Sequence, residues 1–169
     1  MVPRVAYQRD YVRNKKPGYG VHSLALHPSS ERSLVAGGDA HGHVGLWDAN
    51  ACEQQSFKYH RRNVVCMNFN LFKTNELLTT SHDGSVRCFD LDGQVVRLLY
   101  GRPADQFAGY EPTLYHAQWD SSTILVAMHQ GRVGVLDTRQ KCTTKMSKVM
   151  QVIFTLACNS ARYGKCVHA

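Results

Sequence analysis

The sequence predicts an all-β fold built from repeated units, and two observations support this prediction. A glycine followed by an alternating strand that ends in aspartate occurs three times, at 42–48, 84–90 and 131–137. The three aspartates are separated by 42 and 47 residues. This period is typical of the four-stranded, Trp-Asp-type blades of a β-propeller. Because a blade buries its apolar faces only against neighbouring blades, about three blades make an incomplete propeller.

The first repeat, residues 21–58, begins with an alternating strand from Val21. Pro28 ends this strand, because proline has no N–H to donate to a β-ladder. Two middle strands and a weak outer strand are expected at 33–37, 43–48 and 54–58. The glycine-rich segment 38–42 supplies the turn between the middle strands.

The second repeat, residues 60–99, has the clearest pattern. Its four strands are expected at 64–70, 76–81, 85–90 and 95–99. His82-Asp83-Gly84 and Asp92-Gly93 mark tight turns, because an Asp-Gly pair adapts to hairpin geometry. Four strands in this order make one blade.

The third repeat, residues 114–140, has strands expected at 114–119, 123–128 and 132–137. The insert 100–112 lengthens the loop before it and accounts for the larger spacing. The pattern then fades, so 141–169 is expected to be an irregular, divergent tail in which 148–154 could form one extra strand.

The positive charge of the chain is concentrated at its two ends. The formal net charge is +7 over 169 residues. An N-terminal arm, 1–20, holds five Lys or Arg and one Asp, and the tail 141–169 holds five Lys or Arg and no acidic residue. Basic ends suit an acidic partner such as nucleic acid or a membrane surface, but they equally serve as solvated segments that maintain solubility.

Several classes of protein are disfavoured by composition. The six cysteines show no metal-finger spacing with the nine histidines, which predicts reduced thiols and no metal. The N-terminus lacks a secretory signal, and the longest apolar stretch, 149–158, is about half of a membrane span. We therefore expect a soluble, intracellular protein with no cofactor, no small-molecule substrate and no membrane partner.

His60, Ser81 and Asp83 together hold a base, a nucleophile and an acid, as a hydrolase would. No glycine-flanked nucleophile accompanies them, so we interpret them as the buried hydrogen-bonded chain that ties the strands of a WD-repeat blade. Phe89 stands at the Trp position of that chain and has no indole N–H to donate. The sequence predicts no enzyme.

Two groups of residues are candidates for binding. His41, Arg61, Arg62 and His82 fall in loops at one end of the first two blades, where converging cations favour phosphate contacts; ordinary surface charge is the alternative. Asp137 and Arg139 follow a third strand at the opposite end, where an Arg fork can reach a partner's carboxylates or carbonyls; a surface ion pair or turn is the alternative.

Several strings of the sequence resemble one family, and they lie between about residues 16 and 140. They are His27-Pro28-Ser29-Ser30, Leu34 to Asp39, Val44 to Asp48, Asn75 to Ser81 and Gly131 to Arg139. These strings resemble the WD repeat-containing protein 76 family, which is similar to the small subunit of the damaged-DNA-binding complex.

The resemblance implies a seven-bladed, nuclear, chromatin-associated propeller that binds DNA with one face and acts in the DNA-damage response. It also implies a substrate receptor of a cullin-4 RING ubiquitin ligase, whose adaptor meets an Asp-x-Arg motif. Asp137 and Arg139 match that motif, with Leu136 where a Trp often stands. The first-blade turn reads Asp-Ala-His-Gly, where relatives commonly carry a lysine that faces DNA.

Three interpretations of function stay open from the sequence. The first is a non-enzymatic, DNA-binding scaffold, and the second is a protein-interaction module that docks the ligase adaptor without binding DNA. The third is a truncated product, such as a fragment or splice variant, without independent function. In that case the open sheet edges favour self-association or aggregation.

Overall fold

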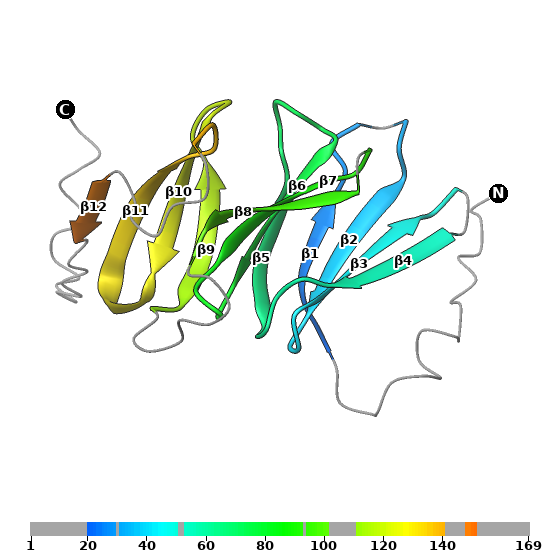
Figure 1. The fold of residues 1–169 in the computed structure, drawn as a ribbon. Helices are drawn as coiled ribbons and strands as arrows, with labels where there is room; N and C mark the ends of the chain where they lie inside the picture. Colours follow the sequence, from blue (N-terminus) through cyan, green and yellow to red (C-terminus); the bar gives the residue numbers. More distant parts are fainter. Residues whose placement is uncertain are drawn as a thin grey trace, which may run out of the picture.

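Three antiparallel sheets, each of four strands, make up the part of the chain that the computed structural model describes (Figure 1). The described residues are 20–29, 31–50, 53–92, 94–101, 111–140 and 148–151. In each sheet the strands are hydrogen-bonded in sequence order, from the first to the fourth. This arrangement confirms the predicted all-β class and the predicted blades.

The blades are called blade 1, blade 2 and blade 3 in chain order. Blade 1 consists of β1 (Val21–Leu26), β2 (Leu34–Asp39), β3 (His43–Asp48) and β4 (Glu53–Lys58). Blade 2 consists of β5 (Val64–Phe69), β6 (Glu76–Ser81), β7 (Val86–Asp90) and β8 (Val95–Tyr100). Blade 3 consists of β9 (Thr113–Gln118), β10 (Thr123–Met128), β11 (Arg132–Asp137) and β12 (Lys148–Gln151), with the short 3-10 turn η1 (His129–Gly131) between β10 and β11.

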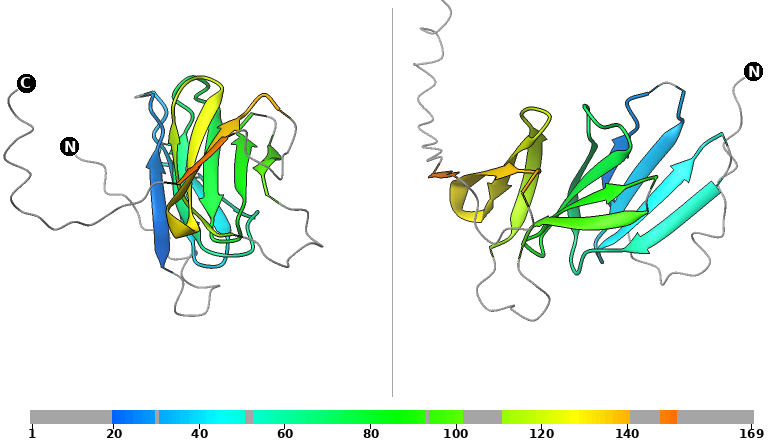
Figure 2. Two further views of the ribbon diagram at one scale, coloured as in Figure 1. Left: turned by 90° about the vertical axis from the view of Figure 1, so that its left-hand side faces the viewer. Right: turned by 45° about the horizontal axis from the view of Figure 1, so that its top comes forward.

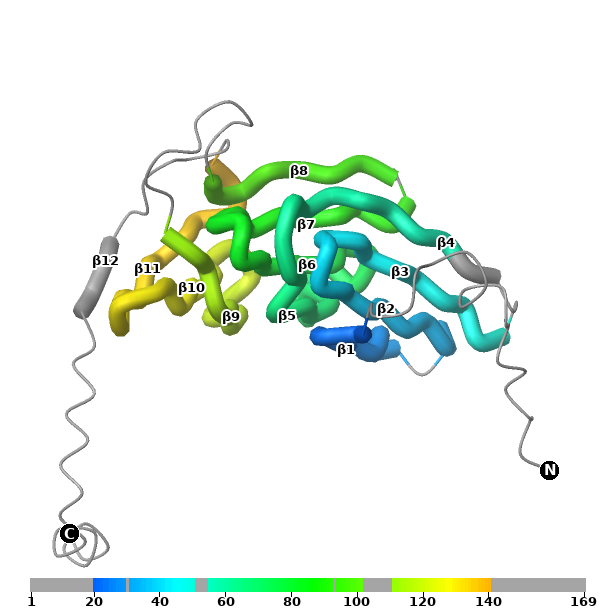
Figure 3. The backbone as a smooth tube through the Cα atoms, turned by 90° about the horizontal axis from the view of Figure 1, so that it is seen from below, coloured from blue at the N-terminus to red at the C-terminus, as the bar shows by residue number. Residues whose placement is uncertain are grey.

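The blades stand side by side in an arc, and Figure 2 shows the same order from two further directions. Viewed from below, β1, β5 and β9 lie along one side of the arc, while β4 and β8 lie along the other (Figure 3). The first strands are in contact, β1 with β5 and β5 with β9. The first strand of each later blade therefore lies against the first two strands of the blade before it.

Two apolar cores fill the spaces between blades. The core between blades 1 and 2 includes Ala25 and Leu46 from blade 1, and Met67 and Phe69 from β5. The core between blades 2 and 3 is built from Leu78, Val86, Cys88, Leu99, Ile124, Val126, Met128 and Leu136. Burying a side chain of this size contributes roughly 1.5 to 3 kcal/mol. Blade 2 is thus packed on both faces.

The predicted strands occur within a few residues of their expected places. The weak outer strand of blade 1 is β4, which pairs with β3 along its whole length. Lys148–Gln151 lies inside 148–154, the part of the tail where one extra strand is expected, and it pairs with β11 as the fourth strand of blade 3. Four segments of the predicted arm, insert and tail lie outside the described residues: 1–19 of the arm 1–20, 102–110 of the insert 100–112, and 141–147 and 152–169 of the tail. No helix in the described part has the length and apolar character needed to cross a bilayer.

Gly42 is a point where the first two blades meet. Its carbonyl accepts hydrogen bonds from the backbone N–H groups of Tyr59 at 3.2 Å and His60 at 3.1 Å. Its φ is +88°, and a Cβ at this position would overlap the backbone carbonyl of His60. Only glycine meets both conditions without strain.

We expect Gly42→Ala to lower the free energy of unfolding by about 2 to 4 kcal/mol, because both the positive φ and the backbone overlap oppose it. Gly45→Ala is the matched control, since the nearest atom to its added Cβ is 3.7 Å away. Urea unfolding of the full chain measures both. Equal unfolding midpoints for the two variants would contradict the requirement for glycine at position 42.

Candidate nucleic-acid interface

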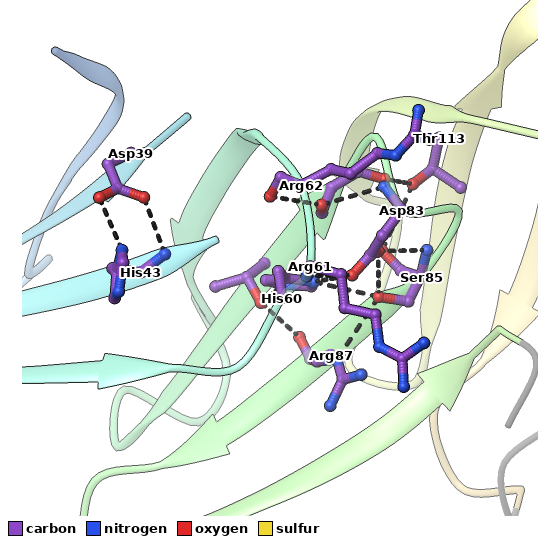
Figure 4. A network of polar contacts seen from close by, with 11 residues as sticks. Asp39, His43, His60, Arg61, Arg62, Asp83, Ser85, Arg87 and Thr113 are labelled. Atoms are coloured by element: carbon purple, nitrogen blue, oxygen red, sulfur yellow. Dashed lines mark hydrogen bonds and ion pairs between the residues drawn. The ribbon is translucent and has the colours of Figure 1, made fainter. Parts of the chain in front are cut away.

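A buried histidine joins the middle hairpin of blade 2 to the connection that enters the blade. His60 lies between β4 and β5 and is 1% exposed. Its Nδ1 is 3.2 Å from Asp83 Oδ2 and 3.0 Å from Ser85 Oγ, and its Nε2 is 2.8 Å from Thr79 Oγ1 (Figure 4). Thr79 lies on β6, and Asp83 and Ser85 lie in the β6–β7 turn. The network therefore connects the start of the blade with its middle hairpin.

Burial decides the protonation of this network. Desolvation lowers the pKa of His60, and the neighbouring Asp83 opposes that shift only in part. Although burial alone would raise the pKa of Asp83, hydrogen bonds from His60, Ser85 and Arg61 hold it well below its ordinary value. A neutral His60 facing a carboxylate carries its proton on Nδ1, so Nδ1–H donates toward Asp83 and Nε2 accepts from the Thr79 hydroxyl.

Ser81 has a different position from the one that its sequence suggests. Its hydroxyl donates to the Arg62 carbonyl at 3.1 Å and accepts from the Asp83 N–H at 3.1 Å. The hydroxyl of β6 that meets His60 is that of Thr79, two residues earlier on the same strand. His60 and Asp83 are thus brought together as expected, while Ser81 acts one step away, on the loop.

Phe89, at the position of the missing Trp, belongs to an aromatic cluster. Its ring centroid lies 5.3 Å from that of Phe57 and 5.5 Å from that of Tyr59. The side chain therefore contributes packing between blades 1 and 2 instead of a hydrogen bond.

The network also fixes the backbone that carries two arginines. The N–H of Arg61 donates to Asp83 Oδ2 at 2.9 Å, and the carbonyl of Arg62 accepts from Ser81. Both arginines are exposed. Figure 4 shows them directly beside the buried groups. The exposed cations are thus attached to a loop whose main chain is held at two consecutive residues.

His82 and His41 extend this end of the molecule. His82 is half-buried in the β6–β7 turn, and its N–H donates to the Asn63 carbonyl at 3.0 Å. His41 is exposed in the β2–β3 turn, where its N–H donates to Asp39 Oδ1 at 2.8 Å. Gly42 joins that turn to the connection before β5. His41, Arg61, Arg62 and His82, named here the basic rim, therefore come from three loops at the same end of blades 1 and 2.

A second buried histidine, which the sequence reasoning missed, joins blades 2 and 3. His116 on β9 is 1% exposed, and its Nδ1 is 2.7 Å from Thr80 Oγ1 on β6. The Asn68 amide lies 3.4 Å from its Nε2. Burial lowers the pKa of His116 to about 4, so its ring is neutral near pH 7. In the sequence, only the position of His116 in an alternating strand indicates that it could be buried, and this pattern does not identify Thr80 as its partner.

Asp137 and Arg139 lie at the other end of the strands, after β11. The Arg139 guanidinium donates from Nε to Asp137 Oδ1 at 3.0 Å and from Nη2 to Oδ2 at 2.8 Å. These bonds lower the pKa of Asp137 to about 2. Arg139 has a side chain 75% exposed. The pair is therefore a preformed, solvent-facing ion pair on a surface separate from the basic rim.

In the part of the chain that the structure describes, no group of three or more His, Cys, Asp or Glu side chains is arranged to hold a metal ion. Within the same ranges Cys66 and Cys88 are free and buried, and burial raises the pKa of the Cys88 thiol to about 11. Both thiols are therefore protonated and act as small apolar groups.

Comparison with known proteins identifies relatives with WD repeats. WD repeat-containing protein 76 of Xenopus laevis is 30% identical over 156 residues, which cover 88% of this chain and 26% of the relative. The Mus musculus protein of that name is 34% identical over 127 residues, covering 73% of this chain and 20% of the relative. The chain is homologous to part of WD repeat-containing protein 76. No protein-family model matches it.

A fungal relative extends the homology. DNA damage-binding protein CMR1 of Phaeosphaeria nodorum is 28% identical over 137 residues, covering 70% of this chain and 26% of the relative. The chain spans about a quarter of the length of these relatives. The homology is therefore to WD-repeat proteins and to proteins named DNA damage-binding.

A solved structure with the same fold is the computationally designed Ika8 protein. The two superpose with a TM-score of 0.58 at 16% sequence identity, over 78% of this chain and 36% of the designed one. At this identity the likeness establishes the fold alone. It supports the propeller-type packing of the three blades.

The buried histidines predict acid sensitivity. The pKa of His116 falls from 6.5 in the unfolded chain to about 4 in the folded one, so the unfolded chain binds the proton first as pH falls. The free energy of unfolding is expected to be full above pH 6.5 and to drop by roughly 3 kcal/mol between pH 6.5 and 4 from this group. His60 acts in the same direction.

Urea unfolding at a series of pH values measures this drop. His116→Gln retains a polar partner for Thr80 but does not titrate, so its profile should be flatter than that of the unaltered chain. The Asp83 contribution lies outside this window, because it is lost only as pH falls below about 3.8. Profiles that stay parallel from pH 6.5 to 4 would contradict the role of His116.

Proposed function

We propose that the chain binds duplex DNA through the basic rim, as part of a nuclear, chromatin-associated protein of the DNA-damage response. The observation that carries the proposal is the attachment of Arg61 and Arg62 to the buried His60–Asp83 network. Two consecutive exposed arginines are held by the Asp83 carboxylate and the Ser81 hydroxyl. Homology to proteins named DNA damage-binding supports it.

A loop fixed in this way suits phosphate binding. The guanidinium groups are always charged and form bidentate contacts with phosphate. Because hydrogen bonds already hold the backbone at Arg61 and Arg62, binding DNA does not have to order that backbone, which lowers the entropic cost. His41 and His82 from the neighbouring turns widen the rim and add donors. Contacts of this kind set affinity and position without reading base sequence.

A second function, docking of the cullin-4 ubiquitin ligase adaptor, is favoured by the geometry of Asp137 and Arg139. Asp137 takes two of the guanidinium's five N–H donors and holds the side chain in place. The exposed remainder is pre-oriented toward a partner's carbonyl or carboxylate groups. As this surface lies at the opposite end of the strands, docking there is compatible with DNA bound at the rim.

DNA binding is tested by fluorescence anisotropy with a labelled duplex over a series of salt concentrations. The Arg61→Ala/Arg62→Ala variant is expected to bind at least about tenfold more weakly at low salt. Its slope of log affinity against log salt should be smaller by about 2, since each lost phosphate contact removes about 0.9. Arg139→Ala, which removes one exposed cation at the other end, is the control and should bind like the unaltered chain. Absence of binding at low salt, or equal binding by the double variant, would refute the proposal.

Docking is tested by capture of the purified adaptor on the immobilised full chain. Arg139→Ala is expected to reduce capture at least about tenfold, because it removes the guanidinium that Asp137 holds oriented toward the partner. The Arg61→Ala/Arg62→Ala variant serves as the control and should capture as much adaptor as the unaltered chain. Unchanged capture by Arg139→Ala would exclude this surface.

A further inference from the structure

The two outer blades expose apolar side chains on their first strands. On β1, Leu24 is 61% exposed and Leu26 is 69% exposed. Tyr115, within β9, is 56% exposed, and Trp119, which directly follows β9, is 71% exposed. Large exposed apolar groups concentrated on particular strand faces mark interaction surfaces. Leu24 and Leu26 are named here the leading face, and Tyr115 and Trp119 the trailing face.

Strand registers show what the leading face corresponds to inside the molecule. Ala25 pairs with Ala36, and Asn68 pairs with Leu78, at equivalent points of blades 1 and 2. Leu24 and Leu26 are therefore the counterparts of Met67 and Phe69. Those two residues of β5 are each only 3% exposed, because they pack against blade 1. In blade 2 the side chains at these positions enter the core between blades 1 and 2, whereas in blade 1 the equivalent side chains, Leu24 and Leu26, are exposed.

The trailing face has internal counterparts as well. Ala117 pairs with Leu125 in blade 3 at the point equivalent to the Ala25–Ala36 pair. Trp119 therefore corresponds to His27, whose ring lies 5.0 Å from that of Phe69 in the contact between blades 1 and 2. His116, on the other side of β9, bonds to Thr80 of blade 2. By strand alternation, Tyr115 and Trp119 point away from blade 2, where a following blade would pack.

We propose that the leading face of one copy docks on the trailing face of a second copy, repeating the contact between successive blades. Leu26 of one copy then meets Trp119 of the other, as Phe69 meets His27 within the chain. A second copy is the partner because the same chain supplies both halves of a contact that it already makes twice internally. The arrangement is head-to-tail, so each copy uses a different face at each contact. It does not involve the basic rim.

The test is sedimentation velocity on the full chain over a wide concentration range. The unaltered chain is expected to show a mass that rises with concentration. Leu26→Glu and Trp119→Glu each remove one face, so each variant alone is expected to stay monomeric. Val95→Glu, which alters an exposed apolar residue on the outer strand β8, is the matched control and should associate like the unaltered chain.

The decisive measurement is an equimolar mixture of Leu26→Glu and Trp119→Glu. Each variant retains the face that the other lacks, so the mixture should form a one-to-one dimer and nothing larger. Circular dichroism of each variant checks that its strands are intact, and Leu24→Glu provides a second variant of the leading face. A monomeric unaltered chain, association that persists in both single variants, or a mixture that stays monomeric would each overturn the proposal.

Discussion

The packing of one blade's first strand against the neighbouring blade is the contact on which the rest of this structure depends. A four-stranded sheet can pair its backbone groups internally, but it buries its apolar faces only against another sheet. β5 has a neighbour on both sides, so Met67 and Phe69 contribute to one core and Cys66 lies against β9. Among the described residues, β1 and β9 each pack against only one neighbouring blade, which leaves Leu24 and Trp119 exposed. The same alternation of side chains therefore produces both the cores and the exposed faces.

Polar contacts decide which loops are held in place, and they depend on this packing. His60 and His116 are buried because blades close over them, and burial keeps their rings neutral. A neutral ring donates one hydrogen bond and accepts another, so each histidine links two elements without its own ring carrying a buried charge. At His60 the linked elements are the entry to blade 2 and its middle turn, and Arg61 follows directly. The positions of the exposed arginines of the basic rim therefore depend on the buried hydrogen bonds of His60 and Asp83.

Particular residues show how far sequence reasoning reached and why it stopped. The repeat period located the blades, and His60 and Asp83 are in contact as the repeat pattern predicts. Ser81 is expected in that network as the Ser or Thr of the blade's second strand. Thr79 and Ser81 lie on the same face of β6, but Thr79 is level with His60, whereas Ser81 ends the strand and meets the loop at Arg62. His116 gave no local signal, because its partner Thr80 is 36 residues away. The strand at 148–151 lies inside 148–154, where the sequence allows one extra strand, but its pairing with the edge of β11 is not visible in the sequence of the tail.

The sequence by itself determined the all-β class, the three-fold repetition and the type of turn, because these follow from local alternation, glycine placement and spacing. It also placed cations in the loops and an acid-x-Arg pair after the last third strand. Only the tertiary structure decided which hydroxyl of β6 meets His60, which side chains hold the backbone of Arg61 and Arg62, and which faces of β1 and β9 remain exposed. The physical reason is that these contacts join residues from different strands and blades, and burial and hydrogen-bond partners exist only once those strands are assembled.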